Sequence, residues 1–299
     1  MKITSEFSMG KGAAYINNQL VPIQDAKISI LDWGFLRSDA TYDVIHLWKN
    51  KLFRVDDHLD RFFNGMQRLH MDIDMTRQQV KQAMIDCVKA SGLTDAYVEV
   101  ICTRGLPEPG SRDPRTCKNQ FMVFAIPFVY LLKPEQKGLS VMISDRVRIP
   151  PSSFDPTIKN YLWLDMVMGL YEAYDQNAES VLLVDEQGNL CEGPGFNIFV
   201  LQGNQLMTPK RGVLEGITRK TVLELGREVG LSVVETDIQP AMALCADEVF
   251  ATSTAGGVMP VTALNGEPVG AGEPGVVTQA LRQAYWALHD DPRYGLVVE

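Results

Sequence analysis

One lysine stands among apolar and aromatic side chains in the stretch SFDPTIKNYLWLDMV, residues 153–167. Lysine is among the residues least often buried, and an amine that loses its charge by desolvation, or beside another cation, becomes a nucleophile toward carbonyl carbons. The ordinary alternative is a lysine near a helix start that packs its stem and leaves its ammonium in water, although a helix N-terminus repels cations. The stretch alone leaves both interpretations of Lys159 open.

A carboxylate follows in the motif EGPGFN, Glu192–Asn197. The glycines on both sides of Pro194 allow a sharp turn and a close approach between the backbone and a ligand. Glu192 enters this turn from an apolar strand, which predicts an acid directed into a site. The alternative is a solvent-exposed acid of a hairpin, where a charge contributes little.

Two further segments have the chemistry to bind an anion. In LEGITRKTV, residues 214–222, Gly216 precedes a predicted helix whose first backbone N–H groups, those of Ile217 and Thr218, lack intrahelical partners. In TSTAGG, residues 252–257, a strand runs into a turn rich in hydroxyl groups and glycine, which can form a second anion-binding turn. An ordinary helix start and an ordinary tight turn are the alternatives.

The motifs of several other chemistries do not occur in this sequence. The four histidines have neither HxxxH nor HxH spacing, and the five cysteines have no CxxC spacing, so no metal site is indicated. No GxGxxG follows a predicted strand, and neither the phosphate-binding GxxxxGK[ST] nor the nucleophile motif GxSxG is present.

Pyridoxal 5'-phosphate is a cofactor that needs all of the groups above at once. Its aldehyde needs an amine, its phosphate needs N–H and hydroxyl donors together with a cation, and its pyridine nitrogen needs an acid that keeps the ring protonated. None of the four signals is strong alone, and their occurrence together in one chain indicates this cofactor.

The elements that must position these residues are a mixture of hairpins and helices. This mixture predicts an α+β (mixed α/β) fold of two lobes, with a smaller N-terminal domain over residues 1–135 and a larger C-terminal domain over residues 136–299. The predicted hairpins cover residues 13–22, 46–55 and 180–209, the helices cover residues 55–73, 76–92, 216–230 and a segment after Lys159, and the further strands cover residues 96–105, 121–132, 232–238 and 248–254, with one more strand after a connector at residues 131–138.

The composition restricts the partners and the location of the protein. A formal net charge of -9 and a pI near 5.1 argue against nucleic acid as a partner, because phosphate backbones bind to basic surfaces. No apolar run reaches the length of a transmembrane helix, and the N-terminal stretch lacks the apolar segment of a signal peptide. We therefore expect a cytoplasmic protein without a membrane partner, whose scattered cysteines are reduced: Cys87, Cys102, Cys117, Cys191 and Cys245.

Beyond these physical arguments, the chain resembles the fold-type IV pyridoxal-phosphate enzymes, also called class IV aminotransferases. The motifs DDHLDRF, IKN, EGPGFN, LEGITRKTV and TSTAGG stand in the order found in that family, and the resemblance runs over nearly the whole chain. It implies the two-lobed fold of D-amino-acid aminotransferases, with the cofactor between the domains and the reactive lysine in the C-terminal domain. It also implies a homodimer whose active sites lie at the subunit interface.

The resemblance implies a role for each matching position. Lys159 is similar to the lysine that bonds to the cofactor and later moves the proton at the reacting carbon, Glu192 to the acid at the pyridine nitrogen, and Arg61 to the arginine that binds the phosphate. Pro194 departs from the family, which often has a small hydroxyl residue there. The further cofactor positions are Asn197, Leu214, Ile217, Thr218, Ser253 and Thr254, and the substrate positions are Arg37, Tyr42, Val44, Glu99, Arg112, Trp163 and Ala255.

Within the family, SDATYDV and VEVICTRG resemble the (R)-selective amine transaminases. Glu99 stands where branched-chain aminotransferases have an arginine, and Arg37 stands where many (R)-amine transaminases have a histidine. In that branch a loop arginine binds the carboxylate of the acceptor; Arg112 is favoured here, and Arg115 is the other candidate. The implied function is amino transfer from an amine or amino acid to a keto acid such as pyruvate; the alternatives are a branched-chain amino acid aminotransferase and a pyridoxal-phosphate lyase similar to aminodeoxychorismate lyase.

Overall fold

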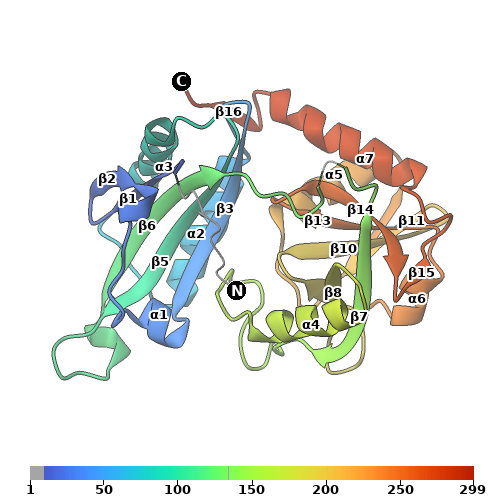
Figure 1. Ribbon diagram of the computed structural model, residues 1–299, viewed down its shortest axis with the longest axis horizontal. Coiled ribbons are helices and arrows are strands. Elements are labelled where there is room, and N and C mark those ends of the chain that lie inside the picture. The colour runs from blue at the N-terminus through green and yellow to red at the C-terminus, as the bar shows by residue number, and fades with distance from the viewer. Residues whose placement is uncertain (1–9, 134) are drawn as a thin grey trace, which may run out of the picture. The chain divides into compact units, whose positions relative to one another are not determined.

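A computed structural model describes residues 10–133 and 135–299 of the chain (Figure 1). Its internal contacts separate two compact units. The first unit contains the chain up to Val129 together with Lys159–Tyr161 and Pro292–Glu299, and the second contains Tyr130–Ile158 and Leu162–Asp291. Lys159 therefore groups with the first unit, whereas the predicted domain boundary places it in the domain of residues 136–299. Residues 1–9, which entered the expectation of a cytoplasmic location, and residue 134 of the predicted connector lie outside the described residues.

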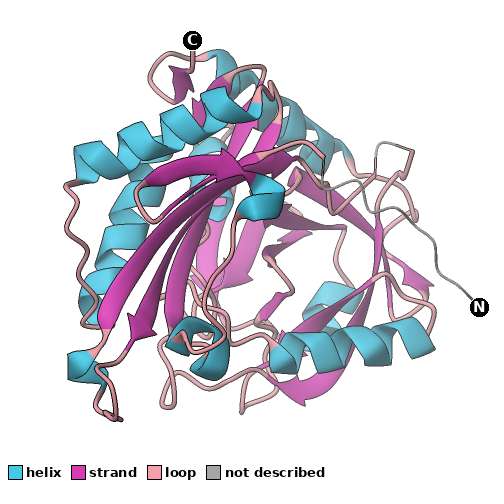
Figure 2. Ribbon diagram, turned by 60° about the vertical axis from the view of Figure 1, so that its left-hand side comes forward, coloured by secondary structure: helices cyan, strands magenta, loops and turns pink. Residues whose placement is uncertain are grey.

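The first unit is built on a seven-stranded sheet in which every neighbouring pair of strands is antiparallel (Figure 2). Two helices, α2 and α3, pack on one face of this sheet through a shared apolar core. In sheet order the strands are β16 (Gly295–Val297), β4 (Lys51–Phe53), β3 (Ala40–Trp48), β5 (Ala96–Leu106), β6 (Lys118–Pro127), β1 (Ala13–Ile16) and β2 (Gln19–Pro22).

Both hairpins predicted in this unit are confirmed, because their turn signals are local. The β1–β2 turn at Asn17–Asn18 and the β3–β4 turn at Lys49–Asn50 have positive φ at both central residues. Such two-residue turns match the twist of antiparallel strands, and asparagine tolerates positive φ better than most residues. The strand predicted over residues 121–132 is shorter at its end, because β6 stops at Pro127, which has no backbone N–H to donate.

The helices of the first unit begin and end at recognisable caps. Helix α3 (Arg77–Ser91) starts after a capping box made by Thr76 and Gln79, and it ends at Gly92 in the left-handed conformation. These caps lie at the two ends of the helix predicted over residues 76–92. Helix α2 (Val55–Arg68) is five residues shorter than predicted. The short helix α1 (Trp33–Arg37) and two 3-10 turns, Ile23–Asp25 and Pro114–Thr116, complete the unit.

The second unit contains a mixed nine-stranded sheet, in which β11–β12, β14–β7 and β7–β8 are parallel pairs. The two sheets with their helices confirm the predicted α+β fold class. The strands follow the order β12 (Ser232–Thr236), β11 (Gln205–Pro209), β10 (Phe196–Gln202), β13 (Glu248–Ser253), β14 (Gly257–Leu264), β7 (Leu139–Val147) and β8 (Ser180–Val184), while β15 (Glu267–Pro268) pairs with β14 and β9 (Glu192–Gly193) pairs with β10.

Strand β8 is covered on both faces, which explains its continuous apolar run. Leu182 and Val184 belong to the main core of the unit, and Val181 and Leu183 pack against helix α4. Successive side chains of a strand point to opposite faces, so such a run fits a strand buried on both sides. The helices of this unit are α4 (Leu164–Asp175), α5 (Ile217–Glu228), α6 (Pro240–Leu244) and α7 (Val276–Ala287), followed by a 3-10 turn at Leu288–Asp290.

Candidate active site

The alternation of side chains along β3 separates two sets of candidate residues in the first unit. Ile45 and Leu47 point into the core beneath α2 and α3, and Asp43 shares their side of the strand. Tyr42 and Val44 point to the opposite face. Glu99 on β5 is the register partner of Val44 and therefore shares that face.

Lys159 lies on the open edge of β3 beside Tyr42. Strand β4 pairs only with the end of β3, and at the other end Thr41 forms a bridge with Asn160. The carbonyl of Lys159 accepts hydrogen bonds from the Thr41 hydroxyl at 2.8 Å and from the Tyr42 backbone N–H at 3.3 Å. The Lys159 ammonium nitrogen stands 4.3 Å from the centre of the Tyr42 ring. Because α4 begins only at Leu164, Lys159 is not a helix-start lysine but part of a segment tied to a strand.

Glu99 is a buried acid near Lys159. The Tyr161 hydroxyl donates to the Glu99 carboxylate, and the Tyr161 ring stacks on Tyr42 with 4.2 Å between ring centres. Burial raises the pKa of Glu99, an effect partly offset by hydrogen bonds from Tyr161 and Tyr97 and by the nearby charge of Lys159. Burial and the neighbouring Glu99 in turn raise the pKa of Tyr161, so its phenol keeps its proton.

On the other side of β3, Asp43 links two side chains of helix α2. It accepts hydrogen bonds from Arg61 at 2.7 Å and 2.8 Å, and the Nδ1 atom of His58 lies 2.8 Å from Oδ1 of Asp43. Burial alone would raise the pKa of Asp43, but Arg61 and His58 outweigh it and hold this pKa below its usual value. Arg61, predicted to bind a phosphate, is therefore held in a fixed orientation.

In the second unit, Glu192 is surrounded by hydrogen-bond donors. One carboxylate oxygen accepts from the Leu214 backbone N–H at 2.9 Å and from the Asn197 amide at 3.3 Å, and the other lies 3.4 Å from Nε of Arg148. Arg148 is itself held by Asp165 at 2.6 Å. Glu192 is buried, which excludes the solvent-exposed alternative, whereas Arg148 was not identified from the sequence because 44 residues separate it from Glu192.

A row of polar side chains crosses three strands beside Glu192. Glu192 on β9 is the register partner of Asn197 on β10, and Asn197 is the partner of Thr252 on β13, so all three share one face of the sheet. The Thr252 hydroxyl is buried and has no hydrogen-bond partner among the described residues. A buried hydroxyl without a partner is uncommon, and a bound polar group would supply one. The motif TSTAGG indicates the turn that Thr252 opens but gives no signal for the buried position of this side chain.

The two predicted anion-binding segments have the expected local structure. Helix α5 begins after Gly216 without a capping side chain among the described residues, so its first N–H groups face outward from the helix end. The Thr218 hydroxyl lies 3.4 Å from the Tyr285 hydroxyl. Ser253 donates to the Gly195 carbonyl at 2.7 Å and so ties the turn of residues 252–257 to that of EGPGFN, while Thr254 stays half-exposed.

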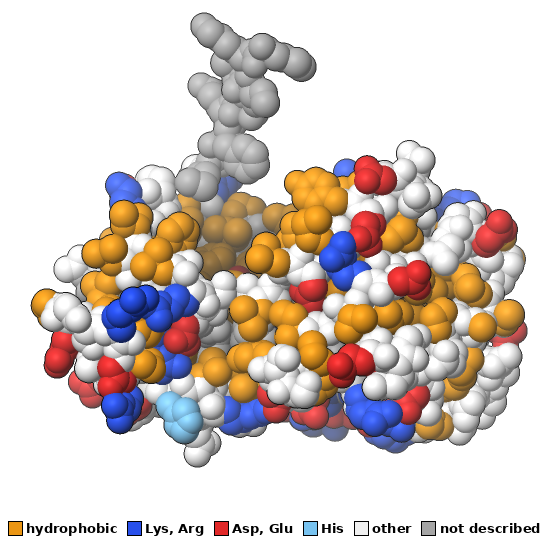
Figure 3. Space-filling model, turned by 90° about the horizontal axis from the view of Figure 1, so that it is seen from below, with side chains coloured by type: hydrophobic (Ala, Val, Ile, Leu, Met, Phe, Trp, Pro, Cys, Tyr) orange, Lys and Arg blue, Asp and Glu red, His pale blue; other side chains and the backbone are white. Residues whose placement is uncertain are grey.

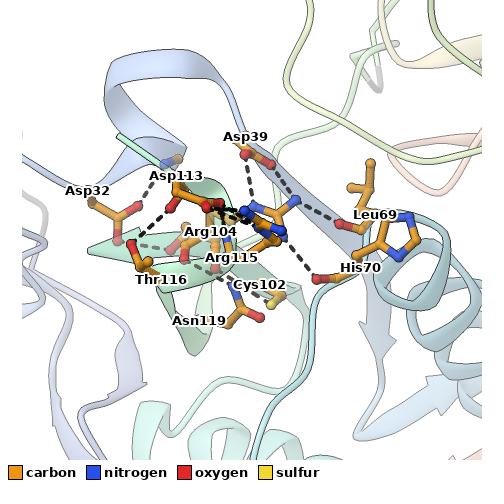
Figure 4. A network of polar contacts seen from close by, with 12 residues as sticks. Asp32, Asp39, Leu69, His70, Cys102, Arg104, Asp113, Arg115, Thr116 and Asn119 are labelled. Carbon is orange, nitrogen blue, oxygen red and sulfur yellow. Dashed lines mark hydrogen bonds and ion pairs between the residues drawn. The ribbon is translucent and has the colours of Figure 1, made fainter. Parts of the chain in front are cut away.

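The two candidate carboxylate-binding arginines lie in the loop that follows β5, and Arg104 near the end of β5 is held by several hydrogen bonds (Figure 4). Arg104 donates to the Asp39 carboxylate at 2.9 Å and 3.0 Å and to the carbonyls of Leu69 and His70 at the end of α2. Arg115 in the loop is engaged by Asp113, 2.5 Å from its guanidinium. Arg112, by contrast, is exposed, and no described side chain pairs with it.

The remaining predicted substrate positions have varied surroundings. Val44 is buried beside Glu99, and Arg37 is exposed with its guanidinium 3.6 Å from the centre of the Trp33 ring. Trp163 precedes α4, and the Ala255 carbonyl accepts a hydrogen bond from the Leu131 N–H. The structure thus brings Lys159, Tyr42, Val44 and Glu99 together in the first unit, and Glu192, Asn197 and Leu214 together in the second.

These residues fit the chemical needs of pyridoxal 5'-phosphate. The two units supply an amine, a buried carboxylate, a helix N-terminus with donor N–H groups and a partnerless buried hydroxyl. Over residues 10–133 and 135–299, no three or more His, Cys, Asp or Glu side chains gather closely enough to hold a metal ion. Within the same residues, every helix is too short or too polar to cross a bilayer.

Comparisons with known proteins agree with this chemistry. The family model described as Amino-transferase class IV matches residues 40–264. The chain is 28% identical to a branched-chain-amino-acid aminotransferase of Pseudomonas aeruginosa over 93% of this chain and 92% of that protein. It is also 28% identical to a D-alanine aminotransferase of Bacillus licheniformis over 90% of this chain and 94% of that protein. The crystal structure of the branched-chain amino acid aminotransferase from Thermobaculum terrenum in its PLP-form superposes with a TM-score of 0.87, at 26% identity, over 96% of this chain and 98% of that one.

The match over residues 40–264 spans β3 to β14 and includes Lys159, Glu192 and the N-terminus of α5. The chain therefore belongs to the class IV aminotransferases, which transfer amino groups with the help of pyridoxal 5'-phosphate.

Proposed function

We propose that this aminotransferase moves an amino group from an (R)-configured amine, or from an amino acid, to a keto acid such as pyruvate. The observation that carries the proposal is the buried acid Glu99 beside Lys159. The (R) configuration rests on the resemblance of SDATYDV and VEVICTRG to the (R)-selective amine transaminases.

In this reaction each residue at the cofactor would have its own role. When bound, the cofactor supplies an aldehyde for the amine and a protonated ring that withdraws electrons. Lys159 would hold the cofactor through its amine and, once displaced by the donor, would act as the base that takes the proton from the reacting carbon of the donor. Glu192, fixed by Leu214 and Asn197, keeps the ring nitrogen protonated. The phosphate is held by Arg61, the first N–H groups of α5 at Ile217 and Thr218, and the turn at Ser253 and Thr254.

The surroundings of Lys159 favour a donor that places an uncharged group near Glu99. Tyr42, Tyr161 and Val44 offer aromatic and apolar surface there. A second carboxylate on the substrate would approach an acid in a poorly solvated position, and like charges in such a place repel. Arg112, exposed on its loop, supports binding of the single carboxylate of a keto acid.

A second candidate is a branched-chain amino acid aminotransferase. The names of several similar proteins and solved structures favour it, including those of Pseudomonas aeruginosa and Thermobaculum terrenum. Its substrates also carry an apolar side chain, so Glu99 excludes a dicarboxylate substrate more readily than it excludes leucine or valine.

Half-reactions of the cofactor-loaded protein with single donors separate these candidates. Conversion of the cofactor from its aldehyde to its amine form is followed by absorbance after addition of (R)- or (S)-1-phenylethylamine, D- or L-alanine, and L-leucine. We expect the fastest conversion with the (R)-amine and little with the (S)-amine. Fast conversion with L-leucine and none with either amine would establish the second candidate instead. Release of pyruvate from an amino substrate without any keto acid would show a lyase.

Two variants test the role of Glu99 in the same assay. Glu99→Gln removes the negative charge, so the rate of amino transfer to 2-oxoglutarate relative to pyruvate should rise about ten-fold. Glu186→Gln, which changes an exposed acid, should leave this ratio unchanged. An unchanged ratio in Glu99→Gln would show that Glu99 does not select the substrate.

We also propose that the chain forms a homodimer. Large apolar side chains are exposed close together in the segment 28–36, and others form a stripe along α4. Hydrophobic side chains are visible at the surface in Figure 3. Exposed apolar clusters on soluble proteins commonly mark association surfaces. The side chains are Ile28, Ile30, Leu31, Phe35 and Leu36 in the first unit and Leu164, Met168, Tyr171 and Tyr174 in the second.

A further inference from the structure

The buried carboxylate of Asp43 contacts the backbone N–H of Val44 and the side chains of Arg61 and His58. Oδ1 accepts from Nη2 of Arg61 and from the backbone N–H of Val44, each at 2.8 Å, and lies 2.8 Å from Nδ1 of His58. Oδ2 accepts from Nε of Arg61 at 2.7 Å. The Asp43 and His58 side chains are 0% and 2% exposed, and that of Arg61 is 12% exposed. We call Asp43, His58 and Arg61 the buried triad.

The geometry of the triad fixes the guanidinium of Arg61. Two of its N–H groups bond to the two oxygens of one carboxylate, which sets both the plane and the direction of the group. An arginine without such a partner keeps many rotamers, and it loses that freedom when it binds an anion. Asp43 restricts the rotamers of Arg61 before any anion binds, so less conformational entropy is lost on binding. The Asp43 carboxylate is itself held on strand β3 by the Val44 N–H.

The same contacts determine the charge of the triad. Asp43 and Arg61 neutralise each other, so with a neutral His58 the triad carries no net charge. Burial lowers the pKa of His58, and the charge of Asp43 offsets this only in part. A dianion bound by Arg61 would leave the triad with excess negative charge in a poorly solvated place. Of the three side chains, that of His58 has the ordinary pKa closest to neutral pH, so His58 is the member of the triad that can take up a proton.

Other charged groups around His58 are already paired. On α2, Arg61 lowers and Asp57 raises the pKa of His58, and Asp57 is held by Arg54 at 2.5 Å. From β3 the facing charge is that of Asp43. From α3, Arg77 and Lys81 pair instead with the exposed acids of α2, Asp56 and Asp60.

We propose that Asp43 positions Arg61 for a phosphate group and that His58 takes up a proton when the anion binds. The inference rests on the proposed role of Arg61 in holding the cofactor phosphate. The proton passes from solvent to His58, so binding of the anion is coupled to pH and favoured by acid. Asp43 and His58 are thus positioning and charge-balancing residues that act through Arg61.

Sulfate binding to the full-length chain freed of cofactor tests the proton uptake. Sulfate is the probe because it carries two charges and does not itself titrate near neutral pH, so any proton taken up goes to the protein. The ring resonances of the four histidines are followed by NMR against pH, with and without saturating sulfate, and His58→Gln assigns the signal of His58. We expect sulfate to raise the titration midpoint of His58 by about one pH unit.

If sulfate raises the pKa of His58, the affinity for sulfate must change with pH by the same factor. Sulfate should bind about ten-fold more tightly well below both midpoints of His58 than well above them. This pH dependence should shrink in His58→Gln and persist in His70→Gln, which changes an exposed histidine. A His58 midpoint that does not move would overturn the proton uptake, and wild-type protein that binds no sulfate would overturn the whole proposal.

Asp43→Asn distinguishes a positioning role from a purely electrostatic role of Asp43, because the two roles predict opposite changes in sulfate affinity. Removal of a negative charge beside Arg61 should tighten sulfate binding if charge alone matters. Loss of the fixed guanidinium should instead weaken it, and we expect about ten-fold weaker binding. Tighter binding in Asp43→Asn would refute the positioning role; if this variant does not fold, the wild-type NMR titration still decides the proton uptake.

Different results would refute the phosphate-binding role of Arg61 and the proton uptake by His58. If Arg61→Gln binds pyridoxal 5'-phosphate as tightly as wild type, the assignment of Arg61 to the phosphate is wrong. If Arg61→Gln loses the cofactor while sulfate leaves His58 of the wild type unaffected, only the proton uptake is wrong.

Discussion

At the scale of single residues, the buried acids Glu192 and Glu99 have different surroundings in their two units. Glu192 accepts hydrogen bonds from a backbone N–H and an amide and lies beside the guanidinium of Arg148. Glu99 accepts from the phenol of Tyr161, and burial raises its pKa. The donors around Glu192 suit a carboxylate that bonds to a ring N–H, and we propose that Glu99 limits which charged groups bind near Lys159.

The raised pKa of Glu99 predicts how stability depends on pH. The folded protein holds the Glu99 proton to a higher pH than the unfolded chain does, so stability falls as pH rises from the ordinary glutamate pKa, about 4.3, through the folded value. Glu99→Gln should remove this part of the decline, as measured by urea unfolding at a series of pH values. The exposed control Glu186→Gln should keep the wild-type pH profile. The prediction fails if Glu99→Gln retains the full decline.

At the scale of elements, the secondary structure could be predicted from the sequence where neighbouring residues form a turn or a helix cap. The capping box at Thr76 and the left-handed Gly92 lie at the two ends of the helix predicted over residues 76–92, and the Asn17–Asn18 turn lies within the hairpin predicted over residues 13–22. The chain around Lys159 was harder to predict, because a bridge to Thr41, more than a hundred residues away, holds it on a strand edge. Local propensity contains no information about such a partner.

For the candidate site, too, residues in local motifs could be predicted from the sequence, and their partners from distant segments could not. Lys159, Glu192 and Arg61 follow from chemistry and from family motifs, whereas their supporting partners do not. Tyr161 reaches Glu99 across 62 residues, and Arg148 reaches Glu192 across 44. Asp43 would have been predictable in part, because strand alternation places it on the helix-covered side of β3, opposite to Tyr42.

At the scale of the whole molecule, the exposed apolar side chains lead to a prediction about assembly. Multi-angle light scattering of the purified chain should give about twice the 33.3 kDa of one chain. Replacement of Leu31 and Phe35 by serine should weaken the assembly, because it removes apolar area that association would bury, whereas Val229→Ser changes an isolated exposed residue and should not. A particle of 33.3 kDa at all concentrations would contradict the homodimer.

The central claim is that Lys159 is the residue that carries the cofactor, and one measurement tests it directly. The cofactor-loaded protein is reduced with borohydride, which makes the bond between the lysine and the cofactor permanent, and the labelled peptide is identified by mass spectrometry. The account predicts a single label on Lys159, and Lys159→Ala should carry no label. A label on another lysine, or a label that persists in Lys159→Ala, would contradict it.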